Sequence, residues 1–181
     1  MTHAEYLAAE ATSEFRHEYL RGEVIAMAGG SLEHAALGAA LAGEVRLALS
    51  GKPCRVFSAD ARVRIAATDM TTYPDLSVVY GPLERAPEDE HALLNPVVLF
   101  EVLSDSTEAY DRGAKASHYR HIPSLREYVL VSQSERRIEV QRRNASGRWE
   151  IYEFTAGQQA VLESLGIVLS LDALYQDPIA G

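Results

Sequence analysis

One carboxylate, Glu101, interrupts the apolar stretch Val97-Val98-Leu99-Phe100-Glu101-Val102-Leu103. The β-branched residues of this stretch and the proline before it predict a central β-strand. On a strand, Glu101 shares one face with Leu99 and Leu103, so apolar neighbours flank it. Burying an ionised carboxylate costs several kcal/mol unless a cation, a metal or hydrogen-bond donors compensate. Glu101 is therefore a candidate functional residue, and the alternative is a buried ion pair with an arginine.

A second carboxylate, Asp75, follows Pro74 at the start of residues 75–80, which also predict a central strand. At that strand end, Asp75 can converge on the face that holds Glu101. Two converging carboxylates repel each other unless a divalent cation joins them, and Mg²⁺ or Mn²⁺ prefers oxygen ligands and keeps several waters. The pair therefore indicates a cation site, although an aspartate after a proline is also common in turns.

A lysine on the next expected helix is a candidate for charge stabilisation. Residues 104–107 can cap a helix over about 111–121, which ends before Pro123. Lys115 on this helix could orient an attacking water and offset charge that builds on a phosphate. The alternative is an exposed helical pair with Asp111, four residues earlier. Tyr119 lies on the same side of the helix as Lys115.

One histidine, His34, lies on the apolar face of a further helix, which Ser31 can cap and which runs to about Leu49. His34 is a secondary catalytic candidate, and the alternative is a hydrogen-bonded histidine of the core. His118 and His121 could face the same way, but with no third ligand they do not predict a zinc site.

Composition and charge bound the class of protein. With 181 residues, of which 47% are apolar, the chain suits one globular domain. Its only cysteine, Cys54, can form no intramolecular disulfide, and no signal peptide or membrane span is found, so a cytoplasmic setting is expected. The formal charge of −9 argues against broad adhesion to nucleic acid but allows a local basic groove.

The remaining elements are expected from periodicity and turn residues. Residues 15–28 predict a short helix or an extended segment, followed by a strand. Residues 55–65 predict a half-buried strand with two arginines on its polar face, and residues 81–95 an exposed acidic loop. Short polar turns predict a meander of three strands over 127–132, 137–143 and 149–154, and the tail predicts a strand and a short helix over 161–175.

Taken together, the motifs resemble a known family. The pattern consists of Pro74-Asp75, then Glu101-Val102-Leu103-Ser104, then Asp111 with Lys115 and Tyr119, and then Glu127-Tyr128. This order resembles the Uma-two-type family of putative restriction endonucleases, within the wider PD-(D/E)XK nuclease superfamily. The resemblance extends to residues 22–27 and to His34, and it covers the chain from about Phe15 to Phe154.

The resemblance implies an α/β (α+β) fold, with a restriction-endonuclease-like mixed central β-sheet flanked by helices in a single nuclease-like domain over residues 1–181. It implies that Asp75 and Glu101 bind Mg²⁺ or Mn²⁺, with the carbonyl of Val102 as a further ligand. The lysine that the superfamily carries two residues after the glutamate is Leu103 here, so Lys115 would take that role. The expected catalytic residues are Asp75, Glu101, Lys115 and His34.

The implied activity is metal-dependent hydrolysis of DNA phosphodiester bonds by water. A basic groove for DNA is expected first at Arg62 and Arg64 and then at Arg142-Arg143, and a homodimer is expected from the family. Two alternatives stay open. A non-catalytic nucleic-acid-binding or dimerisation module would have Glu101 neutralised by an arginine, and a metal-dependent phosphoesterase would act on small substrates.

Overall fold

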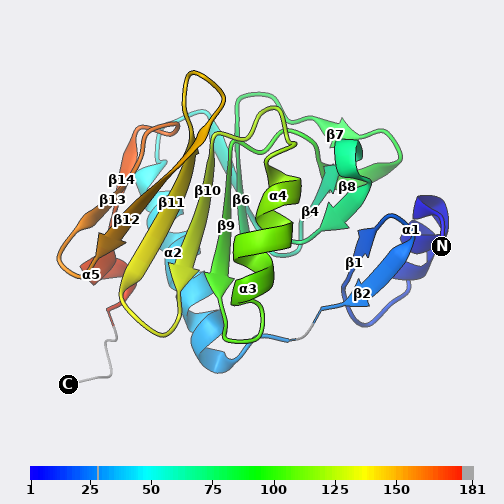
Figure 1. Cartoon of the computed structure of the whole chain (residues 1–181), viewed down its shortest axis with the longest axis horizontal. Helices are drawn as coiled ribbons and strands as arrows, with labels where there is room; N and C mark the ends of the chain where they lie inside the picture. The colour runs from blue at the N-terminus through cyan, green and yellow to red at the C-terminus, as the bar shows by residue number, and fades with distance from the viewer. Residues whose placement is uncertain (28, 177–181) are drawn as a thin grey trace.

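The strand that carries Glu101 lies inside a six-stranded central sheet of the computed structural model, which describes residues 1–27 and 29–176. In spatial order the strands of this sheet are β12 (Trp149–Thr155), β11 (Arg137–Arg143), β10 (Glu127–Ser132), β9 (Val98–Leu103), β6 (Leu76–Tyr80) and β3 (Cys54–Ser58). Strands β9 and β10 are parallel and the other neighbours are antiparallel, so the sheet is mixed. The predicted central strands and the three-strand meander are confirmed (Figure 1).

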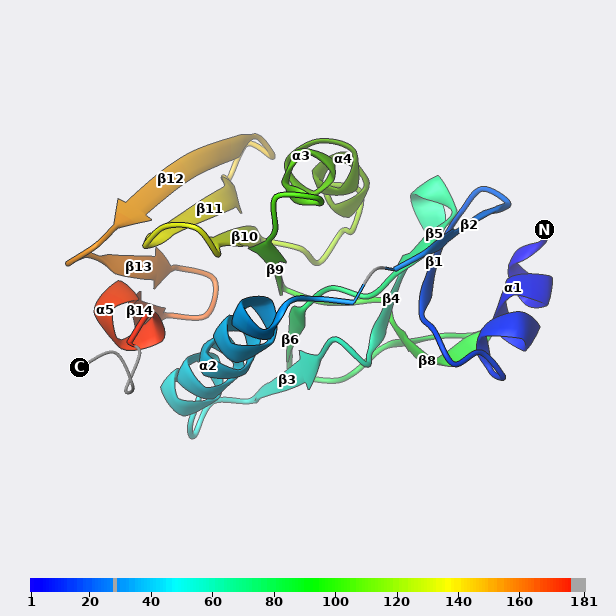
Figure 2. The same cartoon turned by 90° about the horizontal axis from the view of Figure 1, so that it is seen from below.

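Helices cover both faces of this sheet (Figure 2). On one face lies α2 (Leu32–Ala48), whose Leu41 and Val45 pack with Phe100 of β9. On the other lies a continuous helical segment made of α3 (Glu108–Tyr110), the π-helical turn η2 (Asp111–Lys115) and α4 (Ala116–Tyr119). Tyr119 packs there with Leu99. The expected mixed sheet flanked by helices is confirmed, because alternate residues of β9 face two different hydrophobic cores.

A second six-stranded sheet, which the sequence did not predict, lies beside the central one (Figure 1). Its spatial order is β2 (Glu23–Ala26), β1 (His17–Leu20), β5 (Met70–Thr72), β4 (Arg62–Ile65), β8 (Asp89–Leu93) and β7 (Arg85–Ala86). Helix α1 (His3–Glu10) lies next to β1, and the 3-10 turn η1 (Ala66–Thr68) joins β4 to β5.

Of three expectations in this region, one is confirmed in its second alternative and two are corrected. Residues 15–28 contain no helix in their described part and follow the alternative of an extended segment followed by a strand. They form the β1–β2 hairpin, whose turn residues Arg21 and Gly22 both have positive φ angles of 48° and 94°; residue 28 lies outside the described residues. The expected single strand over 55–65 is wrong, because the chain turns after Ser58 and enters the other sheet at Arg62. The expected exposed loop over 81–95 is also wrong, because it forms the β7–β8 hairpin, in which Asp89 is buried.

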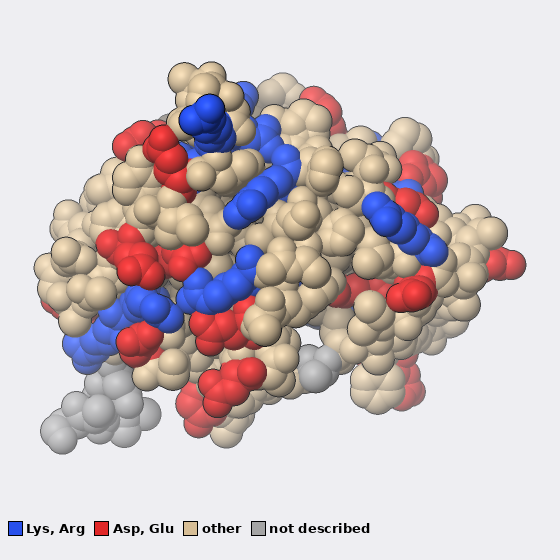
Figure 3. Space-filling view, in the orientation of Figure 1, with Lys and Arg blue, Asp and Glu red and all other residues tan. Residues whose placement is uncertain are grey.

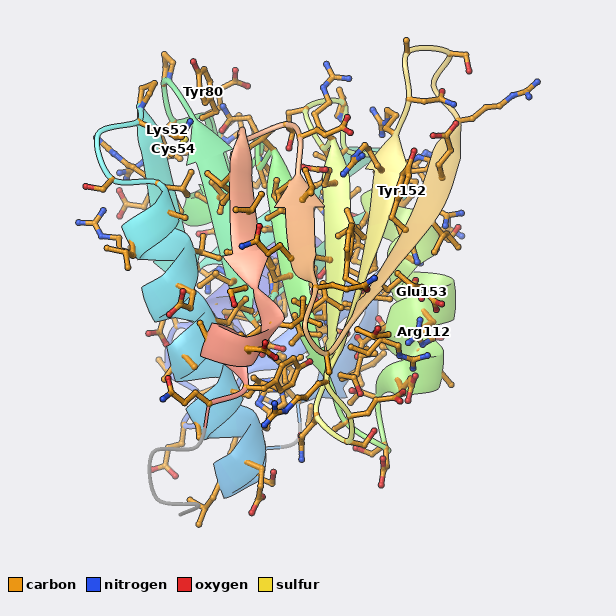
Figure 4. The ribbon with its side chains drawn as sticks, turned by 90° about the vertical axis from the view of Figure 1, so that its left-hand side faces the viewer. Lys52, Cys54, Tyr80, Arg112, Tyr152 and Glu153 are labelled. Atoms are coloured by element: carbon orange, nitrogen blue, oxygen red, sulfur yellow. The ribbon has the colours of Figure 1, made fainter. Side chains whose placement is uncertain are left out.

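The C-terminal part forms a hairpin of β13 (Gln159–Leu162) and β14 (Ile167–Ser170), followed by α5 (Leu171–Leu174). The single strand expected there is therefore two strands. Strand β14 and helix α5 both contact α2, so they extend the cover on that face of the central sheet (Figure 4). In the part of the chain that the structure describes, no helix is long and apolar enough to cross a membrane.

The helix expected over 111–121 begins earlier, at Glu108, and ends at Tyr119. The side chains of residues 104–107 do not cap it as expected. The main-chain carbonyl of Ser104 accepts the hydrogen bonds of the amides of Thr107 and Glu108, while the Ser104 hydroxyl bonds that of Thr107. The side chains of Ser104, Ser106 and Thr107 line the cavity described in the next subsection.

Candidate active site

A cavity of about 540 Å³ lies where the C-terminal end of β9, the N-terminal end of α2 and the start of the α3–η2–α4 segment meet. The titratable groups on its wall come from both large sheets and from both helical covers. They are Glu18, His34, Tyr73, Asp75, Glu101, Tyr110, Asp111 and Lys115. The structure thus brings all four of the expected catalytic residues to one cavity, and their catalytic roles stay predictions.

Asp75 and Glu101 face each other because β6 and β9 are antiparallel neighbours. Leu76 is paired with Phe100, which sets Asp75 beside Glu101 at the end of β6. Oδ2 of Asp75 accepts a hydrogen bond of 2.7 Å from the main-chain amide of Val102. Asp75 is therefore held in the sheet, and its place is not explained by turn chemistry alone.

Glu101 is buried, with 4% of its surface exposed. Its Oε1 accepts a hydrogen bond of 2.7 Å from the Tyr119 hydroxyl and lies 2.9 Å from Nζ of Lys115. Burial raises the pKa of Glu101 above its ordinary value, and the ammonium of Lys115 opposes that shift. The alternative of a pair with an arginine is wrong, since the cation beside Glu101 is a lysine.

Lys115 is enclosed by carboxylates. Its Nζ lies 2.9 Å from Glu101, 3.2 Å from Oε1 of Glu18 and 3.6 Å from Oδ1 of Asp111. Burial acts to lower the pKa of Lys115, but these carboxylates outweigh it and raise the pKa above its ordinary value. The lysine therefore stays protonated. The alternative of an exposed pair with Asp111 is wrong, because both side chains are buried.

The helix widens where it carries these groups. Asp111 and Lys115 are the first and last residues of the π-helical turn η2, and such turns occur frequently at functional sites. The hydroxyl of Tyr128, on β10, donates a hydrogen bond of 3.0 Å to the main-chain carbonyl of Asp111. This hydrogen bond connects the π-helical turn to the central sheet and so restrains the position of Lys115 relative to β9.

His34 reaches the same place from α2. Its Nε2 lies 3.1 Å from the carbonyl oxygen of Val102 and 3.3 Å from Oδ2 of Asp75. The hydrogen bond with Asp75 raises the pKa of His34, although partial burial acts in the opposite direction. His34 therefore faces two of the three expected metal ligands, and the alternative of a histidine within the apolar core does not describe it.

The oxygen atoms of this site fit a hard cation. No described residue donates a hydrogen bond to Oδ1 of Asp75 or to Oε2 of Glu101, and both side chains lie on the cavity wall. Within residues 1–27 and 29–176, no group of three or more His, Cys, Asp or Glu side chains is arranged to hold a metal. The predicted set therefore consists of two carboxylates and the Val102 carbonyl, which suits an ion that keeps several waters.

Two residues of the site are not predicted from the sequence. They are Glu18, the carboxylate that β1 brings to Lys115, and Tyr110, whose hydroxyl donates a hydrogen bond of 2.9 Å to Oε2 of Glu18. Neither residue stands in a motif. The one sequence feature that could indicate Glu18 is its charge within a segment that has the character of a strand. The prediction for residues 15–28 allows either a helix or an extended segment there, so it does not place this side chain.

The arginines expected to form a basic groove are mostly neutralised. Arg62 makes two short bonds to Asp89, of 2.6 and 2.8 Å, and Arg64 pairs with Asp69 and Glu88. Arg142 pairs with Glu127 and Glu163. These side chains supply no free positive charge, because carboxylates lie against each of them.

Arg143 differs from the arginine before it. Its guanidinium lies over the Trp149 ring at 4.9 Å and donates hydrogen bonds to main-chain carbonyls, such as that of Arg120. Within the described residues it has no carboxylate partner, and the same holds for Arg120, Arg126 and Arg148. Basic side chains gather near this place, over the β11–β12 turn and the adjacent end of α4 (Figure 3).

Comparison with known proteins identifies relatives over nearly the whole chain. The family model Uma2, described as "Putative restriction endonuclease", matches residues 3–173. An uncharacterized protein of Synechocystis sp. is 36% identical over 172 residues, which covers 95% of this chain and 90% of that protein. A second uncharacterized Synechocystis protein is 32% identical over 163 residues, covering 90% of this chain and 92% of its own length.

The fold is also found among solved structures. One of them is the crystal structure of a protein described as a putative nuclease belonging to DUF820, from Anabaena variabilis. The TM-score is 0.78 at 18% sequence identity, and the match covers 97% of this chain and 98% of that chain. At this identity the likeness establishes the arrangement of the elements and leaves the chemistry to the residues of the cavity.

Proposed function

The chain belongs to the Uma2 family of putative restriction endonucleases, and from the geometry of its cavity we propose that it is a metal-dependent endonuclease that hydrolyses phosphodiester bonds of DNA. The observation that carries the proposal is the pairing of two carboxylates with a lysine. Asp75 and Glu101 meet across β6 and β9, and Nζ of Lys115 lies 2.9 Å from Glu101.

A bound Mg²⁺ or Mn²⁺ would be held by Asp75, Glu101 and the Val102 carbonyl, where it would supply Lewis-acid polarisation of a phosphate oxygen. Hydrolysis adds water across a P–O bond and gives a phosphate monoester and an alcohol. Lys115 keeps its ammonium charge beside the reacting phosphate and so offsets the negative charge that develops there. Nε2 of His34 donates a hydrogen bond to the Val102 carbonyl and lies 3.3 Å from Oδ2 of Asp75, so His34 holds a proton beside both groups.

The position of Lys115 supports a catalytic site over a non-catalytic binding module. A binding module that only needed to neutralise Glu101 would be served by one cation in a closed core. Here the cation is shared by three carboxylates at the wall of an open cavity. This surplus of negative charge favours the binding of a further cation. DNA is the substrate expected from the family, and a homodimer stays a prediction.

Titration calorimetry with Mn²⁺ tests the metal site without knowledge of a recognition sequence. We expect the native protein to bind Mn²⁺ and Glu101→Ala to lose the binding, while Glu44→Gln, a change on α2 outside the cavity, keeps it. Absence of binding by the native protein, with and without a short DNA duplex, would overturn the proposal.

Cleavage assays then separate DNA from small phosphodiesters. Supercoiled plasmid with Mg²⁺ or Mn²⁺ is expected to be cut by the native protein. Lys115→Ala is expected to cut about 10²- to 10³-fold more slowly, the scale of losing one group that stabilises transition-state charge. Hydrolysis of bis-p-nitrophenyl phosphate without any cutting of plasmid would instead favour a small-substrate phosphoesterase.

A further inference from the structure

We propose that Glu18 is a positioning residue that keeps Lys115 in the active site when Glu101 engages the metal ion. This inference rests on the proposed function, but its central test does not require activity. Glu18 lies in the N-terminal β1–β2 hairpin, outside every motif that the sequence analysis used.

Lys115 has two close carboxylate partners, and they differ in their surroundings. Glu101 adjoins Asp75, so it belongs to the expected metal ligands, and its Oε1 is already shared by Lys115 and Tyr119. Among residues 1–27 and 29–176, Glu18 forms an ion pair with Lys115 alone. A cation bound at Glu101 repels the ammonium of Lys115, because like charges repel, and this repulsion offsets part of the attraction between Lys115 and Glu101.

With Glu101 engaged, Glu18 is the closest anion left for the lysine. Its Oε1 lies 3.2 Å from Nζ, whereas Oδ1 of Asp111 lies 3.6 Å away. Asp111 also sits on the same helical segment as Lys115, so it cannot fix the distance between that segment and the sheets. Glu18 can, because it comes from a different element and from the second sheet.

Glu18 itself is held rigidly. The Thr72 hydroxyl donates a hydrogen bond to its Oε1, and the Tyr110 hydroxyl donates one of 2.9 Å to its Oε2. Only 5% of the surface of Glu18 is exposed. Both carboxylate oxygens are therefore fixed before any substrate arrives, which is what a group needs in order to position another.

The chain contains two lysines, Lys52 and Lys115, which makes Lys115 directly observable. Lysine labelled with ¹³C at Cε gives one side-chain NMR signal for each. Lys52 is exposed at the far end of the molecule, beside Cys54 (Figure 4), and so serves as an internal reference. In the native protein with Mg²⁺ we expect the Lys115 signal to stay distinct from that of Lys52.

In Glu18→Gln, the Lys115 signal is expected to move toward the Lys52 position when Mg²⁺ is added, while the Lys52 signal stays in place. The matched control is Glu23→Gln, an exposed glutamate of the same hairpin. Cleavage should fall about 10- to 100-fold in kcat with KM unchanged, and the affinity for Mn²⁺ should stay within about twofold.

An unchanged Lys115 signal in Glu18→Gln with Mg²⁺ would overturn the inference even if plasmid cleavage is lost. A tenfold or larger drop in Mn²⁺ affinity would also overturn it, because Glu18 would then be a metal ligand. If Glu18→Gln fails to fold, Tyr110→Phe removes one bond to Glu18 and keeps its charge. In Tyr110→Phe, a smaller movement of the Lys115 signal toward the Lys52 position is expected when Mg²⁺ is added. An unmoved Lys115 signal in this variant would also overturn the inference.

Discussion

Lys115 and Arg62 are both largely buried cations, but their partners differ in number and in setting. Arg62 faces one carboxylate, Asp89, through two short bonds in the second sheet, and neither residue lines the cavity. Lys115 faces three carboxylates at the cavity wall. In the first arrangement one positive charge is paired with one negative charge. The second carries surplus negative charge in a place that a ligand can reach, which is a feature of a binding site more than of a structural ion pair.

Removing one partner should lower the free energy of unfolding more for the Arg62–Asp89 pair than for the Lys115 cluster. We expect Asp89→Asn to lower the free energy of unfolding by about 3 kcal/mol, because the largely buried Arg62 then loses the one carboxylate that pairs with it among the described residues. Urea denaturation measures this change. Glu88→Gln is the control, since its half-exposed side chain pairs with Arg64 and its loss should cost less than about 1 kcal/mol. Equal effects of the two variants would contradict the comparison.

The surplus at the cavity predicts the opposite behaviour for Glu101. In Glu101→Gln the lysine keeps Glu18 and Asp111, and the amide oxygen can still accept the Tyr119 hydrogen bond. We expect unfolding free energy within about 1 kcal/mol of the native value, or higher by a similar amount, as is common when a functional carboxylate is replaced. A loss as large as that in Asp89→Asn would show that Glu101 is a structural partner.

A third group of cations pairs with no carboxylate of the described residues. These side chains should contribute to DNA affinity and hardly to the free energy of unfolding. Arg126 and Arg148 are exposed near Arg143 and make no ion pair among residues 1–27 and 29–176. Replacing both by alanine should make the slope of log K against log salt shallower by about 1.8, if each meets one phosphate. Fluorescence anisotropy on a duplex measures the slope. Arg136→Ala is the control, because Arg136 pairs with Asp172; an equal effect there would contradict the assignment.

The central sheet was predictable because its signals are local. The β-branched apolar run around Glu101 and the polar turns between residues 127 and 154 indicate strands from neighbouring residues alone. The second sheet was not predictable in this way, because its strands are short and its order joins β1, β5, β4 and β8 from separate parts of the chain. The segment 55–65 illustrates the limit. One alternating pattern spans it, yet a turn after Ser58 sends its two halves into different sheets.

The residues of the candidate site also differ in whether the sequence around them marks a function. Asp75, Glu101, Lys115 and His34 could be identified from residue type, spacing and family resemblance. Glu18 and Tyr110 could not, because nothing near them in the sequence marks a function. The part of the basic groove expected at Arg62 and Arg64 is not formed, for a related reason. Arg62 and Arg64 stand out as free charges in the sequence, whereas Asp89, Asp69 and Glu88 neutralise them in the fold.

The sequence by itself determined that a carboxylate would be buried in a central strand and that it would need a compensating charge, because periodicity and the cost of burial are properties of a short segment. The tertiary structure decided which charge that is. A Coulomb interaction depends on the distance between two atoms, and only the folded chain sets Lys115 against Glu101, Glu18 against Lys115, and Asp89 against Arg62.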